Sequence, residues 1–170
     1  MTAITAGNFG SWLVRCNPAK WDLAGYRAAG GERVDSVSVV DNYRSAMMQP
    51  GDKVLLWVSG NGRLLARGIW GLGHVTAGVR DEPADARPDG PSHWLDERTR
   101  RAVTHAVFVD IPLLDSPVTD AELKSEAIDD LEVQRVPMGS NPSWLSSEQL
   151  SRVRPLLPPW PRFSPRPVKP

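Results

Sequence analysis

The sequence is poor in the residues that build disulfides and metal sites. It contains one cysteine, Cys16, and three histidines in 170 residues. A single cysteine excludes an intramolecular disulfide and any multi-cysteine metal site. No Cys-His signature surrounds Cys16, so a buried, inert thiol is expected. His74, His93 and His105 lie on separate segments without the spacing of metal ligands, so no metal or other cofactor is predicted.

Long apolar runs and a net charge are also missing. No run approaches the roughly 20 apolar residues of a membrane helix, and the beginning of the chain lacks the pattern of a signal peptide. We therefore expect a cytoplasmic protein without a membrane partner. Twenty basic residues balance twenty acidic ones. Such a chain is poorly suited to coating duplex DNA through its phosphates, but it could still carry a small site for one base.

Motifs of catalysis are absent as well. The glycines at Gly60–Gly62 and Gly71–Gly73 are not followed by Lys-Ser/Thr, so they do not form a phosphate loop. Neither a Ser-His-Asp order nor a paired acid and base is present. An enzyme is therefore the weaker interpretation.

What the sequence does contain is a series of short strands with helical segments between them. Alternating or valine-rich stretches predict strands at Ser11–Asn17, Val34–Val40, Lys53–Ser59, Ala66–Val75, His105–Leu114 and Leu131–Val136. Helical segments are predicted at Trp21–Ala29, at Asn42–Met48, from the capping box Thr119–Glu122 to about Asp130, and from the capping box Ser146–Gln149 to Pro155. This pattern indicates an α+β fold in which a small mixed sheet closes into a barrel.

Two segments are predicted to lie outside this barrel. Arg80–Pro91 is rich in proline and charge and is predicted to be an exposed loop. The C-terminal tail is proline-dense, and Trp160 and Phe163 are expected to pin it to the body. We therefore divide the chain into a domain at 1–157 and a tail at 158–170.

Aromatic and amide side chains follow several predicted strands. A planar ligand needs an aromatic face to stack on and a few fixed polar groups that read its edge. An asparagine offers both a donor and an acceptor. Candidates of this kind are Asn17, Trp21, Trp57, Ser59, Ser140 and Asn141, with Trp57 and Ser59 expected on one strand face. Core packing of Trp57 and ordinary turn roles for the asparagines remain alternatives.

Several stretches, in this order, resemble the EVE domain of the PUA-like superfamily, whose relatives include the YTH readers of methylated adenine. They are SWLVRCNPAKWDL, VVDNYRSAMMQPGDKVLLWVSGNGRLLARGIWGLGHV, VFVDIPLL and VQRVPMGSNPSWLSSEQ. The resemblance covers roughly Gly10–Leu157. It implies a PUA-like pseudo-barrel of five to six short strands, with a pocket at one end that captures a flipped, modified base of DNA or RNA.

The resemblance also implies roles for individual residues. Asn17 would read the base edge and Trp21 would line the pocket. Ser59 and Gly60 would form the rim, Trp57 would line the wall or pack beneath it, and Ser140 and Asn141 match a Gly-Ser/Thr-Asn motif.

The sequence departs from the family pattern in two places. Many relatives carry a cage tryptophan in the region of Val34–Val40, which has no aromatic residue here, and Tyr43 is the nearest substitute. Cys16 replaces a common serine. Candidate phosphate contacts are Arg15, Arg44, Arg63 and Arg67.

The leading hypothesis is a non-enzymatic module that captures a modified base, a methylated cytosine or adenine derivative, and works with an effector nuclease or other protein in trans. One alternative is a small nucleotide- or RNA-modifying enzyme that uses the same pocket. Another is a protein-interaction module that acts through the proline-rich tail.

Overall fold

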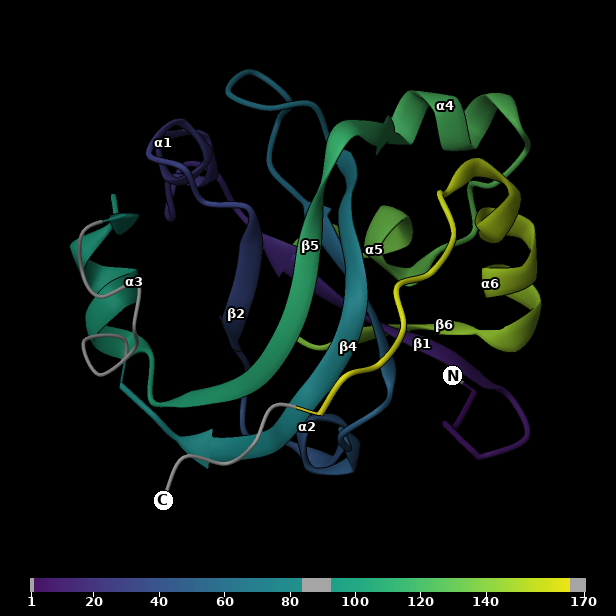
Figure 1. Cartoon of the computed structure of the whole chain (residues 1–170), viewed down its shortest axis with the longest axis horizontal. Coiled ribbons are helices and arrows are strands. Elements are labelled where there is room, and N and C mark those ends of the chain that lie inside the picture. Colours follow the sequence, from purple (N-terminus) through teal and green to yellow (C-terminus); the bar gives the residue numbers. More distant parts are fainter. Residues whose placement is uncertain (1, 84–92, 166–170) are drawn as a thin grey trace.

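The computed structural model describes residues 2–83 and 93–165, and in this part the chain forms one mixed sheet of six strands (Figure 1). The strand order is β2-β5-β4-β3-β1-β6. Neighbouring strands are antiparallel except β1 and β3, which are parallel. The strands are β1 (Phe9–Cys16), β2 (Arg33–Ser38), β3 (Lys53–Val58), β4 (Gly68–Asp81), β5 (His105–Thr119) and β6 (Ser143–Ser146).

Short helices cover the two sides of the sheet. In Figure 1, α1 and α3 lie on one side, while α4 and α6 lie on the other. The helices are α1 (Leu23–Ala28), α2 (Tyr43–Met47), α3 (Glu97–Ala102), α4 (Asp120–Ser125), α5 (Glu132–Arg135) and α6 (Ser147–Val153), and a 3-10 turn follows at Arg154–Leu156. Over residues 2–83 and 93–165, none of the helices has the length and apolar character needed to cross a membrane.

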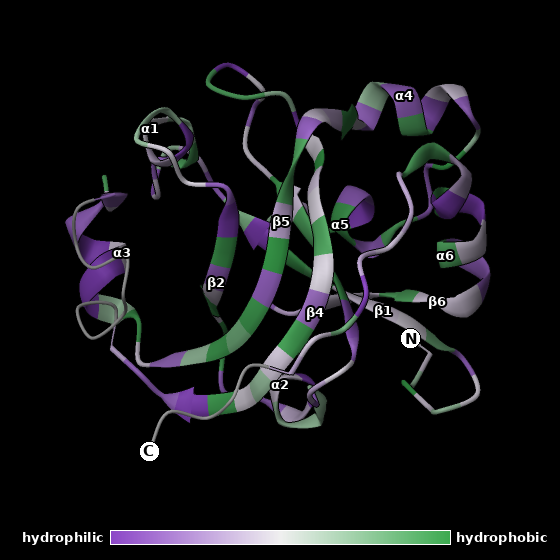
Figure 2. Cartoon of the chain, in the orientation of Figure 1, coloured by the Kyte–Doolittle hydropathy of each residue, from purple (hydrophilic) through white to green (hydrophobic). Residues whose placement is uncertain are grey.

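The central strands are buried on both faces, and this divides the core into two clusters. Alternate residues of a strand point to opposite faces. In β1, Trp12 and Val14 belong to a cluster inside the curved sheet, while Leu13 belongs to a second cluster on the outer face. In β3, Leu56 joins the inner cluster and Trp57 the outer one. Figure 2 shows green, hydrophobic segments recurring along the neighbouring strands β4 and β5.

Glycines let β4 and β5 approach each other closely. A Cβ atom at Gly73 would collide with the carbonyl oxygen of Asp110 on β5, and a Cβ at Gly71 would lie 2.6 Å from Cγ2 of Ile111. Both positions therefore need glycine for close packing of the two longest strands. This explains why an otherwise apolar strand contains so many glycines.

Most predicted elements are confirmed, but the predicted last strand is wrong. The predicted strand Leu131–Val136 is the short helix α5, because Gln134 caps it by accepting the backbone N–H of Leu131 at 2.9 Å. The last strand is β6, which the sequence analysis missed. Both predicted capping boxes, at Thr119 and Ser146, are present. The first of these helices ends at Ser125 rather than near Asp130.

The lengths of other elements also differ from the predictions. Strand β4 continues to Asp81, so the predicted loop Arg80–Pro91 is wrong at its start, and its residues 84–91 lie outside the described residues. Helix α3 was not predicted. The α+β fold itself is as predicted.

The described part of the tail packs against the sheet, as predicted. Nε1 of Trp160 donates a hydrogen bond to the carbonyl oxygen of Gly73 at 2.9 Å, and its ring packs against the outer cluster. The ring of Phe163 lies 5.4 Å from that of His74. The tail therefore covers part of the outer face of β4.

Replacing Trp160 with alanine should destabilise the fold. A fully buried Trp→Ala change costs about 3–5 kcal/mol, so the loss at this half-buried position is expected near 2 kcal/mol. Equilibrium urea unfolding measures it, with Trp160→Phe as the variant that keeps a ring but lacks the N–H donor. An unchanged midpoint for Trp160→Ala would contradict the packing of the tail.

Candidate functional site

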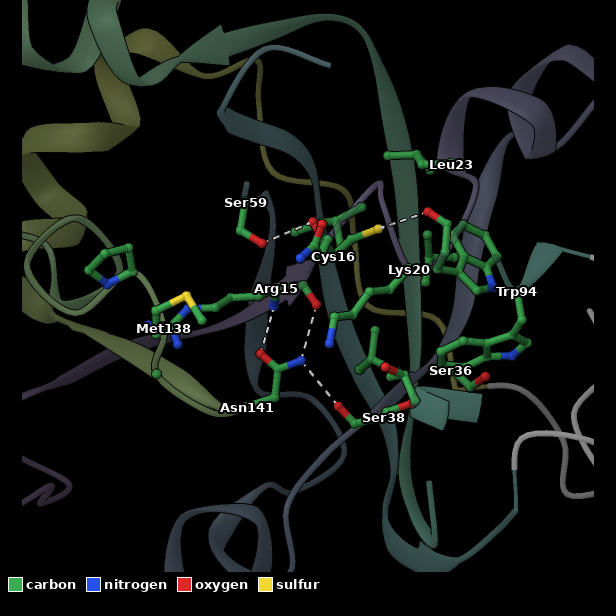
Figure 3. Close-up of a pocket in the computed structure, with 18 residues that line it drawn as sticks. Arg15, Cys16, Lys20, Leu23, Ser36, Ser38, Ser59, Trp94, Met138 and Asn141 are labelled. Atoms are coloured by element: carbon green, nitrogen blue, oxygen red, sulfur yellow. Dashed lines mark hydrogen bonds between the residues drawn. The ribbon is translucent and has the colours of Figure 1, made fainter. Parts of the chain in front are cut away.

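A pocket of about 320 Å³ opens at the end of β1, between β2 and the turn that precedes β6 (Figure 3). Its floor is apolar and comes from the inner core cluster, and its rim is polar. The lining residues are Arg15, Cys16, Asn17, Lys20, Trp21, Leu23, Val34, Ser36, Val37, Ser38, Leu56, Ser59, Trp94, Thr99, Pro137, Met138, Gly139 and Asn141.

The side chain of Asn141 closes one wall of the pocket. Its Oδ1 accepts the backbone N–H of Arg15 at 2.7 Å, and its Nδ2 donates to the carbonyl oxygens of Arg15 and Ser38, both at 3.1 Å. The backbone carbonyl of Asn141 also accepts the N–H of Val40 at 3.1 Å. Since β2 and β6 are the two edges of the sheet, these bonds join the edges and complete the barrel.

The end of β1 forms the second polar part of the rim. Oδ1 of Asn17 accepts the backbone N–H of Ala19 at 3.0 Å, which fixes the side chain in an Asx turn. Within the described part of the chain, Nδ2 of Asn17 has no hydrogen-bond partner. The N–H of Ser59 donates to the carbonyl of Cys16 at 2.9 Å. Asn17 therefore offers an oriented donor at the rim.

Burial keeps the thiol of Cys16 protonated. Desolvation raises the pKa of Cys16 to about 12, because a thiolate is poorly stabilised away from water. Its Sγ lies 4.0 Å from the carbonyl oxygen of Trp21. The thiol is therefore a neutral part of the pocket wall.

Two tryptophans supply the aromatic part of the lining. Trp21 and Trp94 form an isolated antiparallel bridge, and the N–H groups of Asp22 and Leu95 donate to the carbonyls of His93 and Lys20 at 2.7 and 2.8 Å. The Trp21 ring also packs against Tyr26 and His93, with centroids 5.2 and 5.7 Å away. The contacts with Tyr26 and His93 thus hold the Trp21 ring in place.

Lys20 is the cation that reaches into the pocket. Figure 3 shows its side chain directed towards Asn141 and Ser38. Its ammonium group lies 4.0 Å from a carboxylate oxygen of Asp96, and half of its side chain is exposed. The guanidinium of Arg15 instead donates to the carbonyl of Val136 at 3.0 Å, and desolvation lowers its pKa.

The structure brings five of the predicted site residues together at the pocket. They are Arg15, Asn17, Trp21, Ser59 and Asn141. Gly60 lies just outside, with Oδ1 of Asn17 3.6 Å from the place a Cβ would occupy.

Other predicted site residues lie elsewhere. Trp57 is fully buried in the outer cluster, and Leu56, not Trp57, shares the pocket face with Ser59, so the expected common face of Trp57 and Ser59 is wrong. Tyr43 is exposed on α2 and does not line the pocket, and neither does the exposed Ser140.

The remaining arginines among the predicted phosphate contacts are spread over two elements. Arg44 is paired with Glu132 at 2.6 Å, and the side-chain bonds to Glu132 and Tyr43 raise its pKa despite desolvation. Arg63 and Arg67 lie in the loop between β3 and β4, and Arg63 is exposed.

Three residues that line the pocket are not predicted from the sequence, namely Lys20, Trp94 and Met138. Trp94 could have been recognised as a candidate pocket residue, because it is an aromatic residue in a polar segment just before the helix cap Asp96. No sequence pattern around Lys20 or Met138 indicates that these residues line a pocket. Over residues 2–83 and 93–165, no group of three or more His, Cys, Asp or Glu side chains could hold a metal ion.

A family model of the EVE domain matches residues 10–147. The chain belongs to the EVE domain family. The predicted resemblance is thereby confirmed, while the domain boundary at residue 157 stays a prediction.

Solved structures with the same fold come from several organisms. A hypothetical protein from Leishmania major has a TM-score of 0.60 at 21% identity, covering 89% of this chain and 96% of that one. The DUF55 domain of human thymocyte nuclear protein 1 has a TM-score of 0.56 at 17% identity, covering 86% and 98%. Human THYN1 in complex with DNA containing 5-methylcytosine has a TM-score of 0.56 at 16% identity, covering 86% and 96%. A comparison with curated proteins finds no significant match.

Replacing Asn141 with alanine should open the barrel at the pocket. The change removes three side-chain hydrogen bonds, and each buried group left unpaired costs about 1–3 kcal/mol, so a loss of at least about 2 kcal/mol is expected. Urea unfolding measures it, with the exposed neighbour Ser140→Ala as the matched control. Equal stability of the two variants would contradict the role of Asn141.

The thiol of Cys16 should react slowly with disulfide reagents in the native protein. With a pKa of about 12, only about one side chain in ten thousand is a thiolate at pH 8. Labelling by an aromatic disulfide reagent should be slow in buffer and fast in denaturant. Rapid labelling of the folded protein at pH 8 would contradict this.

Proposed function

We propose that this chain is a non-enzymatic reader of a modified base, with a methylated cytosine of DNA as the favoured ligand. The observation that carries the proposal is the meeting of the Trp21 and Trp94 indoles with the unpaired Nδ2 donor of Asn17 in one pocket. An aromatic face binds the flat side of a base, and a fixed amide reads its edge.

The pocket suits a ligand of this size and polarity. Its volume of about 320 Å³ lies at the small end of the range for small-molecule sites. Asn17 and Lys20 offer donors, which match the N3 and O2 acceptors of cytosine. The hydroxyl oxygen of Ser59 lies on the same rim and can accept a bond from an exocyclic amine.

The apolar floor gives a reason for preferring a methylated base. Leu23, Val34 and Leu56 lie at the base of the pocket and belong to the inner core cluster. Burying one methyl group contributes about 0.8 kcal/mol, a preference of roughly fourfold. The complex of human THYN1 with DNA containing 5-methylcytosine supports DNA and methylated cytosine over RNA and an adenine derivative.

The groups around the pocket favour binding over catalysis. Among the lining residues of the described chain there is neither a carboxylate nor an imidazole, and the Cys16 thiol is protonated. General acid–base chemistry needs such groups within hydrogen-bond reach of the substrate. A reader of this kind would pass its signal to an effector nuclease or other protein in trans, and both this partner and the cytoplasmic location remain predictions.

Binding of short single strands tests this proposal. Labelled DNA and RNA strands with one central cytosine, 5-methylcytosine, adenine or N6-methyladenine are followed by fluorescence anisotropy. We expect saturable binding that is tightest for 5-methylcytosine in DNA. Trp21→Ala should weaken it by about 5- to 150-fold, because one base stack contributes about 1–3 kcal/mol.

Two further variants locate the ligand. Asn17→Ala should weaken binding about 2- to 12-fold through the loss of one edge hydrogen bond. Tyr43→Ala is the control, since Tyr43 is an exposed aromatic residue outside the pocket. Equal losses in Tyr43→Ala and Trp21→Ala, or equal affinity for all strands, would overturn the proposal.

A further inference from the structure

A tight turn at Val136–Gly139 carries apolar side chains at the mouth of the pocket. The N–H of Gly139 donates to the carbonyl of Val136 at 3.0 Å, so Pro137 and Met138 occupy the two central positions. Met138 is 95% exposed, more than any other large hydrophobic residue that the structure describes, and half of Val136 is exposed. An apolar tip in water needs an explanation, because exposed turns normally carry polar residues.

This turn is held firmly against β1. The carbonyl of Val136 accepts a second hydrogen bond from Nη2 of Arg15 at 3.0 Å. Gly139 packs on the same guanidinium, since a Cβ there would lie 2.5 Å from Nη1. Asn141, two residues further on, is bonded to the backbone of Arg15. The backbone that carries Met138 is therefore fixed before any ligand arrives.

The turn places Met138 at the mouth of the pocket, next to the position that a bound base would occupy. Pro137 and Met138 line the pocket, and Figure 3 places Met138 on the opposite side of it from Trp94. A base that enters the pocket leaves a gap in the duplex at the pocket mouth. The side chain next to that mouth is an unbranched methionine, whose flexible thioether adapts to irregular surfaces.

We propose that Met138 is a wedge that enters a DNA duplex and fills the gap left by the flipped base. Apolar side chains such as methionine and leucine unstack base steps in this way in other DNA-binding proteins. The inference rests on the proposed function, and it adds that the natural target is duplex DNA. Arg15 acts as a positioning residue, because its guanidinium holds the turn through the carbonyl of Val136.

If Met138 is a wedge, its replacement should affect the affinity for duplex DNA and for single-stranded DNA differently. A single strand has no gap to fill, so Met138 should contribute more to duplex binding than to single-strand binding. Labelled duplexes and single strands, each with one central 5-methylcytosine, are titrated with the intact protein and with Met138→Ala, Met138→Leu and Met47→Ala. Met47 is the matched control, since it is an exposed methionine on α2 outside the pocket.

We expect Met138→Ala to lose at least about 5-fold in duplex affinity and clearly less in single-strand affinity, where only its contact with the pocket lining is lost. Met138→Leu and Met47→Ala should bind both probes like the unchanged protein. A 2-aminopurine that neighbours the target base and pairs with thymine should brighten on binding, and less so with Met138→Ala. Equal losses on duplex and single strand, or none on either, would overturn the wedge while leaving base capture intact. Failure of the unchanged protein to bind the single strand would instead remove the proposed function.

Discussion

The pocket depends on one amide side chain that joins the two edges of the sheet. A curved six-stranded sheet leaves unpaired backbone groups on its first and last strands, and such edges are sites of unwanted pairing. Here Asn141 satisfies the backbone of Arg15 on β1 and the carbonyl of Ser38 on β2 at the same time. The closure gives the pocket a wall, and it also places the Val136–Gly139 turn beside the opening. Stability and site geometry are therefore set by the same bonds.

The division of the core into two clusters explains why a pocket can exist without weakening the fold. The outer cluster packs α4, α5, α6 and Trp160 against the sheet and includes the fully buried Trp57. The inner cluster is covered less completely at the end of β1, where Leu23, Val34 and Leu56 are reached from the pocket. Burial of apolar surface on the outer face can stabilise the protein while the inner face stays available to a ligand.

Most local patterns can be recognised in the sequence, and long-range pairings cannot. The capping boxes at Thr119 and Ser146 depend on side chains three residues apart, so they could be predicted. Strand β6 has only four residues and is defined by its pairing with β1, which no local pattern reveals. The stretch Leu131–Val136 alternates like a strand, but the cap from Gln134 makes it helical. The fold class was still predicted correctly, because it depends on the number and order of the elements and not on each boundary.

For the site, too, local patterns could be recognised in the sequence and long-range pairings could not. Asn17 and Trp21 could be predicted, since they follow a recognisable strand and turn. Trp94 could not be placed, because its position depends on pairing between two segments about seventy residues apart. The amide of Asn141 can both donate and accept hydrogen bonds, which makes it a candidate for reading a base edge. In the structure it does both, but its partners are backbone groups of this chain. A side chain suited to reading a base is equally suited to joining two strands, and only the structure separates these uses.

The central claim is that one base enters the pocket between Trp21 and the rim at Asn17. A ¹H–¹⁵N NMR titration with a short DNA strand that carries a single 5-methylcytosine tests it most directly. The account predicts that the largest shifts occur at the Trp21 indole N–H and the Asn17 side-chain amide, with smaller shifts for the unmethylated strand. Equal shifts for both strands, confined to exposed arginines away from the pocket, would contradict it.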